Sequence, residues 1–381
     1  MVTIKEIAKH CNVSIATVSN IINGKPNASK ETKERVLQAI EELNYTPNYI
    51  AKNLKTRRTR TIGVVVEDIT VFCAPEIIDG ITKCCEEKGY HILLTNLRLY
   101  KKFGDSYYDN EKFFQMVRRE VKELIAKQVD GIVYVTAHER ALKCLPENLT
   151  VPASMAYGYT KSEHYPSVVV DDKKGAYEIV NYVISMGHKK IGVITGKERS
   201  IHTHDRLLGY QKALYDHSLF FNPDAIVEGG WTREGGYAAT DRLLDQKVTA
   251  IFCMNDIMAG GVYDRLEELG LTPGQDISVV GFDNRELSNY YKPPLTTTAL
   301  PLYEIGYTAC ANVIEEVESE SEENAKENEG IEETEETGTA RKAKGLEKGR
   351  SGQIIEIPES CKLLIRQSVK DIREEQTGSG E

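Results

Sequence analysis

"TIKEIAKHCNVSIATVSNIIN", residues 3–23, predicts two short helices joined by a tight turn. Thr3 and Glu6 have the spacing of a capping box, in which each residue satisfies a backbone amide of the other at the start of a helix. Residues 12–14 (NVS) are expected to form the turn, and Ser14 is expected to cap a second helix over residues 15–23. This pattern of helix, turn and helix is typical of a helix-turn-helix motif.

A third helix is expected after this pair. Ser29 is placed to cap it, and Val36, Ile40 and Leu43 recur at i, i+4 and i+7 on one face. Three short helices with a tight turn between the first two predict a helix-turn-helix DNA-binding domain over residues 1–46. In such domains the second helix enters the major groove of double-stranded DNA.

The second helix of this domain has two different faces. Val18 and Ile21 lie on the side that is expected to pack in the core, whereas Ile15, Ala16 and Asn20 lie on the other side. An asparagine amide can bond an adenine edge, and a small apolar side chain can contact a thymine methyl group. The outer face is therefore predicted to read bases, and a helical bundle with an inert surface is the alternative.

The charge of the chain is unevenly distributed. The formal net charge is −10, but residues 1–60 contain seven Lys and four Arg against five Glu, which makes +6 and leaves −16 for the rest. A basic segment on an acidic body is typical of a module that contacts nucleic acid. The charge by itself is also compatible with a solvated basic face.

Composition narrows the class of protein further. Of the 381 residues, 40% are apolar, which is enough for globular cores, and no apolar run reaches the length of a membrane span. The chain opens on a polar, capped helix rather than a signal peptide, so a cytoplasmic protein is expected. The eight cysteines form no CxxC pair, which favours reduced thiols over disulfides or a zinc site.

From residue 61 onward, short apolar strands alternate with amphipathic helices. The strand segments are TIGVVVE, YHILLTN, DGIVYVT, SVVVDD, KIGVITG, TAIFCM and ISVVGFD. This alternation predicts parallel sheets with helices on both faces. The number of units favours two doubly wound lobes, and ligands of such folds bind beyond the carboxyl ends of the strands.

Residues 3–66, with the motifs TVS, LNYTPN and RTRTIGVVV, resemble the N-terminal region of the lactose/galactose repressor (LacI/GalR) family. The segments GHKKIGVITG, RLLGYQKAL, IFCMNDIMAGG and DISVVGFDN resemble the periplasmic-binding-protein-like core of the same family. The resemblance implies an all-α helix-turn-helix domain at 1–46 and a hinge helix and linker at 47–60. It implies an α/β two-lobed core at 61–381 that binds an effector and forms dimers.

The same resemblance assigns contacts with DNA. It places Ile15, Ala16 and Asn20 at base-reading positions, and many relatives carry Arg where this chain has Asn20, so the operator sequence stays open. It also implies that Leu54 on the hinge helix wedges into the minor groove beside its dimer mate and kinks the duplex. Packing of Leu54 on its own domain is the alternative. The residues expected to contact DNA are Thr3, Ser14, Ile15, Ala16, Thr17, Asn20, Asn23, Ser29, Thr32, Tyr45, Asn48, Ala51, Leu54 and Lys55.

Five residues are expected to bind the effector, four of them implied by the family motifs. An Arg fork and a carboxylate bond hydroxyl groups, and an indole forms an apolar wall for a ring, so the set suits a sugar. Each of the four has an alternative role: a core tryptophan, a turn aspartate, a helix-capping asparagine, and an arginine in a surface ion pair. The five residues are Phe72, Arg206, Trp231, Asn255 and Asp283.

No cofactor, metal site or catalytic constellation is expected. His202 and His204 form an HxH pattern, but no third metal ligand is in view. The segment GGWTREGG lacks the spacing of a dinucleotide site, and no nucleophile elbow, HExxH motif or P-loop is present. An enzyme is therefore not predicted.

Residues 315–350 form an acidic insertion in the family pattern, dominated by Glu with Lys, Gly and Thr. The segment is predicted to be disordered, because its few apolar side chains cannot offset the entropy of ordering. An inert loop is one interpretation, and a segment that repels nonspecific DNA is the other.

These features predict a cytoplasmic repressor of transcription, homodimeric or tetrameric, that binds double-stranded operator DNA. Its operator affinity is expected to respond to a small effector, a sugar or a related metabolite. An activator or global regulator acting with a protein corepressor is an alternative, and so is a solute-binding module without DNA function. No membrane partner is expected. The sequence leaves open the identity of the effector, whether it acts as an inducer or a corepressor, and the operator sequence.

Overall fold

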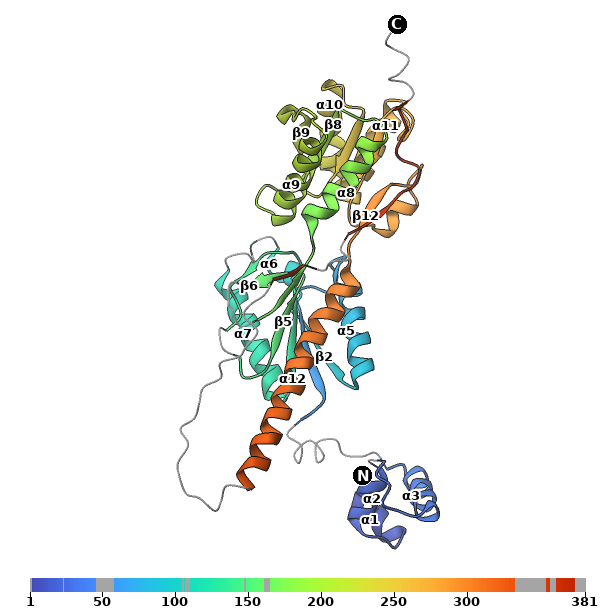
Figure 1. Cartoon of the computed structure of the whole chain (residues 1–381), viewed down its shortest axis with the longest axis vertical. Coiled ribbons are helices and arrows are strands. Elements are labelled where there is room, and N and C mark those ends of the chain that lie inside the picture. The colour runs from blue at the N-terminus through green and yellow to red at the C-terminus, as the bar shows by residue number, and fades with distance from the viewer. Residues whose placement is uncertain are drawn as a thin grey trace. The chain divides into compact units, whose positions relative to one another are not determined.

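The computed structural model (Figure 1) describes residues 2–22, 24–45, 58–104, 106, 110–146, 149–160, 165–332, 354–356 and 361–373. The chain divides into two compact units, Met1–Thr59 and Arg60–Glu381, here termed the N-terminal and C-terminal units. Several residues predicted to contact DNA lie outside the described residues: Asn23, Asn48, Ala51, Leu54 and Lys55.

The described part of the N-terminal unit contains three helices: α1 (Ile4–His10), α2 (Ile15–Ile22) and α3 (Lys30–Glu42). Ile7, Val18 and Val36 are fully buried, one from each helix, and form the centre of a small apolar core. Apolar residues at helical spacing therefore bring the three helices together, and the prediction of a helix-turn-helix fold is confirmed.

Side-chain caps begin these helices where the sequence predicts them. Thr3 and Glu6 form a capping box, in which the Thr3 amide donates to the Glu6 carboxylate at 2.7 Å. Ser14 Oγ accepts from the Thr17 amide at 3.0 Å, and Ser29 Oγ accepts from the first turn of α3. Each cap satisfies an amide that the helix itself leaves without a partner.

The first lobe of the C-terminal unit is a parallel six-stranded sheet in the order β13-β7-β5-β3-β1-β2. Its strands are β1 (Thr61–Val66), β2 (His91–Asn96), β3 (Gly131–Val135), β5 (Ala153–Ala156), β7 (Ser167–Val169) and β13 (Ile354–Glu356). Its helices are α5 (Ala74–Lys88), α6 (Leu99–Phe103), α7 (Glu111–Ala126) and α12 (Leu302–Glu332), and the short strands β4 (Ala141–Leu142) and β6 (Tyr159–Thr160) pair beside them.

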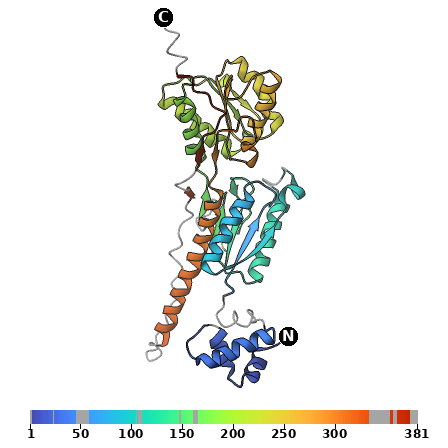
Figure 2. The same ribbon diagram turned by 90° about the vertical axis from the view of Figure 1, so that its right-hand side faces the viewer.

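Helices cover both faces of this sheet (Figures 1 and 2). Alternate residues of a strand face opposite sides, so Val64 packs in one apolar layer and Val65 in the other. Helices α5 and α12 contribute to the layer of Val64, and α7 contributes to the layer of Val65. The predicted parallel, doubly wound arrangement is confirmed for this lobe.

The second lobe is a parallel four-stranded sheet in the order β11-β10-β8-β9. Its strands are β8 (Ile191–Thr195), β9 (Ile226–Glu228), β10 (Ala250–Cys253) and β11 (Ser278–Val280). Its helices are α8 (Asp172–Ser185), α9 (Ile201–Asp216), α10 (Arg233–Asp245) and α11 (Asp256–Glu268), with 3-10 turns at η1 (Pro223–Ala225) and η2 (Glu286–Asn289). An antiparallel pair, β12 (Thr297–Ala299) and β14 (Lys362–Leu364), accompanies this lobe.

The acidic insertion departs from the sequence prediction. Helix α12 spans 31 residues and continues to Glu332, so the prediction of disorder is wrong for residues 315–332. The helix starts in the core, where Ile305 and Val313 are buried, and Glu, Ala and Lys extend it at little cost because its nucleus already exists. Residues 333–350 lie outside the described residues. Neither α12 nor any other described helix is long and apolar enough to cross a membrane.

Candidate functional site

Helix α2 presents a distinct outer face in the N-terminal unit. Ile15 is 45% exposed and Ala16 is exposed, whereas Val18 is fully buried. Asn20 is half-buried at the edge of the same face, and Tyr45, after α3, packs against the core of the unit. The three side chains predicted to read bases therefore point away from the core.

Hydroxyl groups mark the N-termini of the helices in this unit. The hydroxyls of Ser14 and Thr17 are 2.8 Å apart at the start of α2, and those of Ser29 and Thr32 are 2.9 Å apart at the start of α3. Thr3 occupies the equivalent place on α1. Helix N-termini carry exposed amides and the positive end of the helix dipole, which attract phosphate groups. These positions suit contacts with a DNA backbone.

A cavity of about 470 Å³ lies between the two lobes of the C-terminal unit. Its lining comes shortly after β1, β3 and β5 of the first lobe and after β8, β9, β10 and β11 of the second. The cavity therefore lies at the carboxyl ends of the strands, where ligands of doubly wound sheets bind. The structure brings all five residues of the predicted effector site into this lining: Phe72, Arg206, Trp231, Asn255 and Asp283.

Arg206 is the centre of a buried network at the cavity. The side chain is 2% exposed; its Nε donates to Asp172 Oδ1 at 2.6 Å, and its Nη1 donates to the Met254 carbonyl and lies 3.3 Å from Asp283 Oδ1. Burial alone would lower the pKa of Arg206, but the two carboxylates outweigh it and raise that pKa. The alternative of a surface ion pair for Arg206 is therefore wrong.

Asp283 occupies a less favourable electrostatic position. Burial raises the pKa of its carboxyl group to about 6, although the adjacent Arg206 opposes this shift. Its φ of 100° lies in the left-handed region, where side chains other than glycine are strained. Trp231, with φ of 73°, shares this feature. Strained residues persist where the surrounding structure holds them, and they cluster at ligand sites.

Trp231 forms an apolar wall of the cavity and is held in place by its neighbours. A Cβ atom at Gly196 would lie 1.9 Å from the indole, so a glycine is required beneath the ring. Asn255 Nδ2 donates to the Trp231 carbonyl at 3.3 Å, while its Oδ1 accepts from the Met258 amide at 2.8 Å and caps α11. Asn255 thus has the predicted capping role and also lines the cavity.

Comparison with known proteins identifies the family. A family model for "Bacterial regulatory proteins, lacI family" matches residues 3–48, and one for "Periplasmic binding protein-like domain" matches residues 180–335. Catabolite control protein A of Priestia megaterium is 35% identical over 316 residues, 81% of this chain and 90% of that protein. The HTH-type transcriptional repressor PurR of Aliivibrio salmonicida is 34% identical over 328 residues, 85% of this chain and 94% of that protein.

The chain belongs to the lacI family of bacterial regulatory proteins. As a lacI-family member it is a DNA-binding regulator of transcription. Its fold is similar to that of the lac repressor dimer solved with operator and the anti-inducer ONPF. The two share a TM-score of 0.70 and 24% identity, with 97% of this chain and 99% of that chain covered. A lacI-family regulator of Enterococcus faecium, solved with bound ribose, has a TM-score of 0.57 and 25% identity, with 82% and 100% covered.

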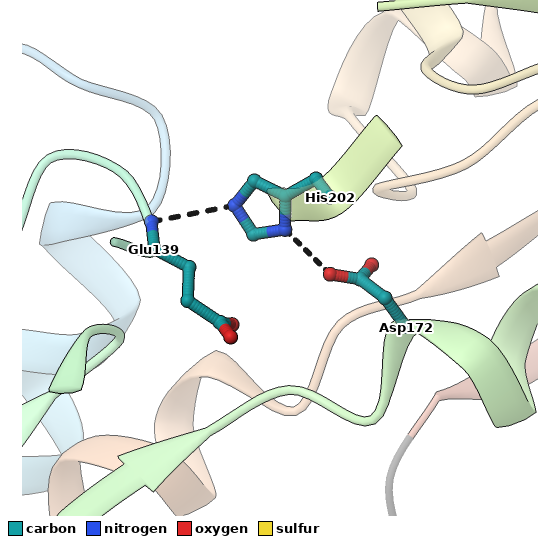
Figure 3. Close-up of side chains that lie close together, drawn as sticks. All are labelled: Glu139, Asp172 and His202. Carbon is teal, nitrogen blue, oxygen red and sulfur yellow. Dashed lines mark hydrogen bonds and ion pairs between the residues drawn. The ribbon is translucent and has the colours of Figure 1, made fainter. Parts of the chain in front are cut away.

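A second buried cluster links the lobes of this lacI-family chain (Figure 3). His202 Nδ1 lies 2.5 Å from Asp172 Oδ2, and His202 Nε2 lies 3.4 Å from the Glu139 amide nitrogen across the lobes. Burial raises the pKa of Glu139 to about 8. Burial would lower the pKa of His202, but Asp172 raises it.

One ligand atom from each of these three residues falls within 4.8 Å of the others, a spacing that could hold a metal ion. The histidine nitrogens, however, already contact Asp172 and the Glu139 amide, and Asp172 also accepts from Arg206. We therefore interpret the cluster as a hydrogen-bonded link between the lobes. The HxH pair itself is not brought together, because His204 is exposed and positions i and i+2 point to different sides of a helix.

Several lining residues were not predicted from the sequence. Most of them lie within a few residues of the end of a strand, as Lys197 does after β8, and this position in the sequence is the signal that could have indicated them. Asp256, beside the cavity, is fully buried, accepts from the Thr297 hydroxyl at 2.6 Å and has its pKa raised by burial to about 8. The unpredicted charged or hydrogen-bonding residues of the lining are Thr70, Tyr100, His138, Tyr157, Lys197, Arg199, Ser200, His202, Thr232 and Arg285.

Proposed function

We propose that this chain is a transcriptional repressor whose affinity for operator DNA is set by a small molecule, a sugar or a related metabolite, bound between its lobes. The observation that carries the proposal is the cavity itself, because its lining combines both lobes with the buried network of Arg206 and Asp283. A ligand that contacts both lobes favours one arrangement of them over another. Such differential affinity is the requirement for control by an effector.

The N-terminal unit supports the DNA-binding half of the proposal. In the docking mode of helix-turn-helix proteins, α2 enters the major groove with Ile15, Ala16 and Asn20 toward the bases. A single helix of this kind reads a short half-site, so we propose a homodimer on a two-fold symmetric operator. A protein that binds chromosomal DNA acts in the cytoplasm of a bacterium.

Asp283→Asn tests the effector role. The substitution keeps the volume of the side chain. It removes the negative charge, which strengthens the hydrogen bonds that the carboxylate accepts from hydroxyl groups of a ligand. We expect operator binding without effector to stay unchanged and effector affinity to fall roughly tenfold to hundredfold, since a hydrogen bond to a charged group contributes about 1.5–3 kcal/mol. The measurement is an operator titration at increasing effector concentration.

The effector is first found by thermal melting against sugars, nucleosides, purines and their phosphate esters. A ligand at about a hundred times its Kd adds about 2.7 kcal/mol of stability. Asp245→Asn, an exposed position at the end of α10, is the matched control and should respond like wild type. A wild-type response of Asp283→Asn would show that Asp283 lies outside the effector site.

A further inference from the structure

The segment after β3 carries a glutamate of the first lobe into contact with the second lobe. Glu139 is 8% exposed, and its amide donates to His202 Nε2 of α9 at 3.4 Å. One oxygen of its carboxyl group lies within 4.8 Å of Asp172, the first residue of α8, and of the same imidazole (Figure 3). A carboxyl group of one lobe is therefore enclosed by side chains of the other, and it loses these surroundings whenever the lobes move apart.

The basic groups beside Glu139 are engaged by other carboxylates. Arg206 is paired with Asp172 and Asp283, and His202 Nδ1 bonds Asp172. The Nε2 atom of His202 accepts from the Glu139 amide, so it cannot at the same time donate to the Glu139 carboxyl group. Within the described part of the chain, Glu139 Oε2 has no hydrogen-bond partner. An ionised carboxylate buried in this way costs far more free energy than a neutral carboxyl group, so this arrangement of the lobes favours a protonated Glu139.

Electrostatics at Glu139 act mainly in the same direction. Burial has the largest effect on its carboxyl group; His202 opposes that effect, whereas the carboxylates of Asp172 and Asp205 add to it. The pKa of Glu139 consequently rises to about 8. The titratable and charged groups around Glu139 are Asp172 of α8, His202, Asp205 and Arg206 of α9, Tyr159 of β6, and its chain neighbours His138 and Arg140, the latter paired with Glu67.

Separation of the lobes changes the surroundings of Glu139 more than those of its partners. Asp172, His202 and Arg206 come from α8 and α9 of the second lobe, so their mutual contacts persist when the lobes part. Glu139 returns to water, where its pKa is about 4.5. Between about pH 4.5 and 8 the closed arrangement therefore binds more protons than an open one. The resulting stability of the closed arrangement is complete below about pH 4.5 and is lost as the pH rises through about 8.

We propose that Glu139 is a pH-sensitive latch between the two lobes, protonated when the lobes are closed and ionised when they are apart. A fall in pH favours the closed arrangement, and a rise in pH favours the open one. The latch acts without an effector and so goes beyond the proposed function. Because the cavity lies between the same two lobes, the latch makes the affinity of a ligand that bridges them dependent on pH.

Trp231, the single tryptophan of the chain, lines the cavity and can report its opening. The test is quenching of tryptophan fluorescence by acrylamide in the full chain, without effector, between about pH 6 and 9. We expect the quenching constant of wild type to increase as the pH rises past about 8, because an open cavity admits the quencher. Glu139→Gln is neutral at every pH and should lose this increase. Glu86→Gln, at an exposed position of α5 in the same lobe, is the matched control and should follow wild type.

Far-ultraviolet circular dichroism of the same samples separates opening of the lobes from unfolding. Increased quenching with an unchanged dichroism spectrum supports the latch, and an increase that coincides with loss of the spectrum overturns it. Constant quenching of wild type, an unaltered pH profile in Glu139→Gln, or a flat profile in Glu86→Gln would also overturn it. Because no effector is present, each of these results is independent of the operator titration that tests control by an effector.

Discussion

At the scale of single residues, a buried ion pair lies at the centre of the network beside the cavity. Arg206 and Asp172 are each 2% exposed and are held 2.6 Å apart. Removing one partner of such a pair leaves an uncompensated charge, which typically destabilises a protein by about 3–5 kcal/mol. For this reason Asp283→Asn is a cleaner probe of the site than truncation of Arg206, because it retains the hydrogen-bonding shape of the side chain.

Glu139 leads to a prediction about pH. Its pKa rises from 4.5 to about 8 because it is buried, so folding takes up a proton between these values. The stability from this group is complete below about pH 4.5 and is lost as the pH rises through about 8. Burial also raises the pKa of Asp256 to about 8, which adds to the loss of stability as the pH rises. We expect wild type to melt at progressively lower temperature from about pH 5 to 8.

Glu139→Gln mimics the protonated carboxyl group, so it should flatten this dependence without abolishing it, since Asp256 remains. The measurement is the free energy of unfolding by denaturant at several pH values. The exposed Glu198→Gln serves as control and should keep the wild-type slope. A wild-type slope in Glu139→Gln would rule out Glu139 as a source of the pH dependence.

At the scale of elements, close packing of helices α5 and α12 anchors the first lobe. A Cβ atom at Gly306 of α12 would lie 1.9 Å from the Ile77 carbonyl oxygen of α5, and one at Gly80 of α5 would lie 2.0 Å from the Tyr303 carbonyl oxygen. Both obstacles are backbone atoms, so no side-chain rotation relieves them. The two glycines therefore allow α5 and α12 to approach each other closely, and the two helices run side by side in Figure 2.

Gly306→Ala sets two effects against each other. Alanine has the higher helix propensity by about 1 kcal/mol, whereas the backbone clash resembles overpacking, which costs about 1–3 kcal/mol or more. The clash should prevail, and we expect net destabilisation of about 1–2 kcal/mol in denaturant unfolding. Glu304→Ala, at an exposed position of the same helix, should change stability by less than about 0.5 kcal/mol. If the Gly306→Ala variant were more stable than wild type, α5 and α12 could move apart to admit the methyl group without a cost in the free energy of unfolding.

At the scale of the whole molecule, the chain consists of two units, each with its own apolar core. The core of the N-terminal unit contains Ile7, Val18 and Val36, and the C-terminal unit has its own apolar layers. The charge follows the same division, with +5 in residues 1–59 and −15 in residues 60–381. A basic reader on an acidic body should bind DNA with a strong dependence on salt.

Leu54 lies near the end of the N-terminal unit in the sequence, and its role stays a prediction. We expect Leu54→Ala to weaken operator binding by a few kcal/mol, because the wedge that unstacks a base step is lost. Binding to random DNA and the melting temperature should change little, since the two cores are untouched. Parallel titrations with operator and random duplexes make the measurement. Equal losses on both duplexes would argue against a wedge in the minor groove.

The sequence by itself determined the local structure of this protein. Thr3 with Glu6, Ser14 and Ser29 mark helix starts through bonds that span three residues or fewer, so their spacing is readable along the chain. The strands are similarly visible, because burial on both faces demands continuous apolar runs. The family motifs extended this reading to four of the five predicted residues that line the cavity.

Tertiary structure alone decided the charge of that cavity and the link between its lobes. Lys197 and Arg285 are 88 positions apart in the chain and face one space because β8 and β11 end at the same edge of a sheet. Glu139, Asp172 and His202 come from three segments, and none signals its partners locally. Helix α12 extends past its core for a related reason: a helix that is nucleated by packing elsewhere needs no apolar residues of its own to continue.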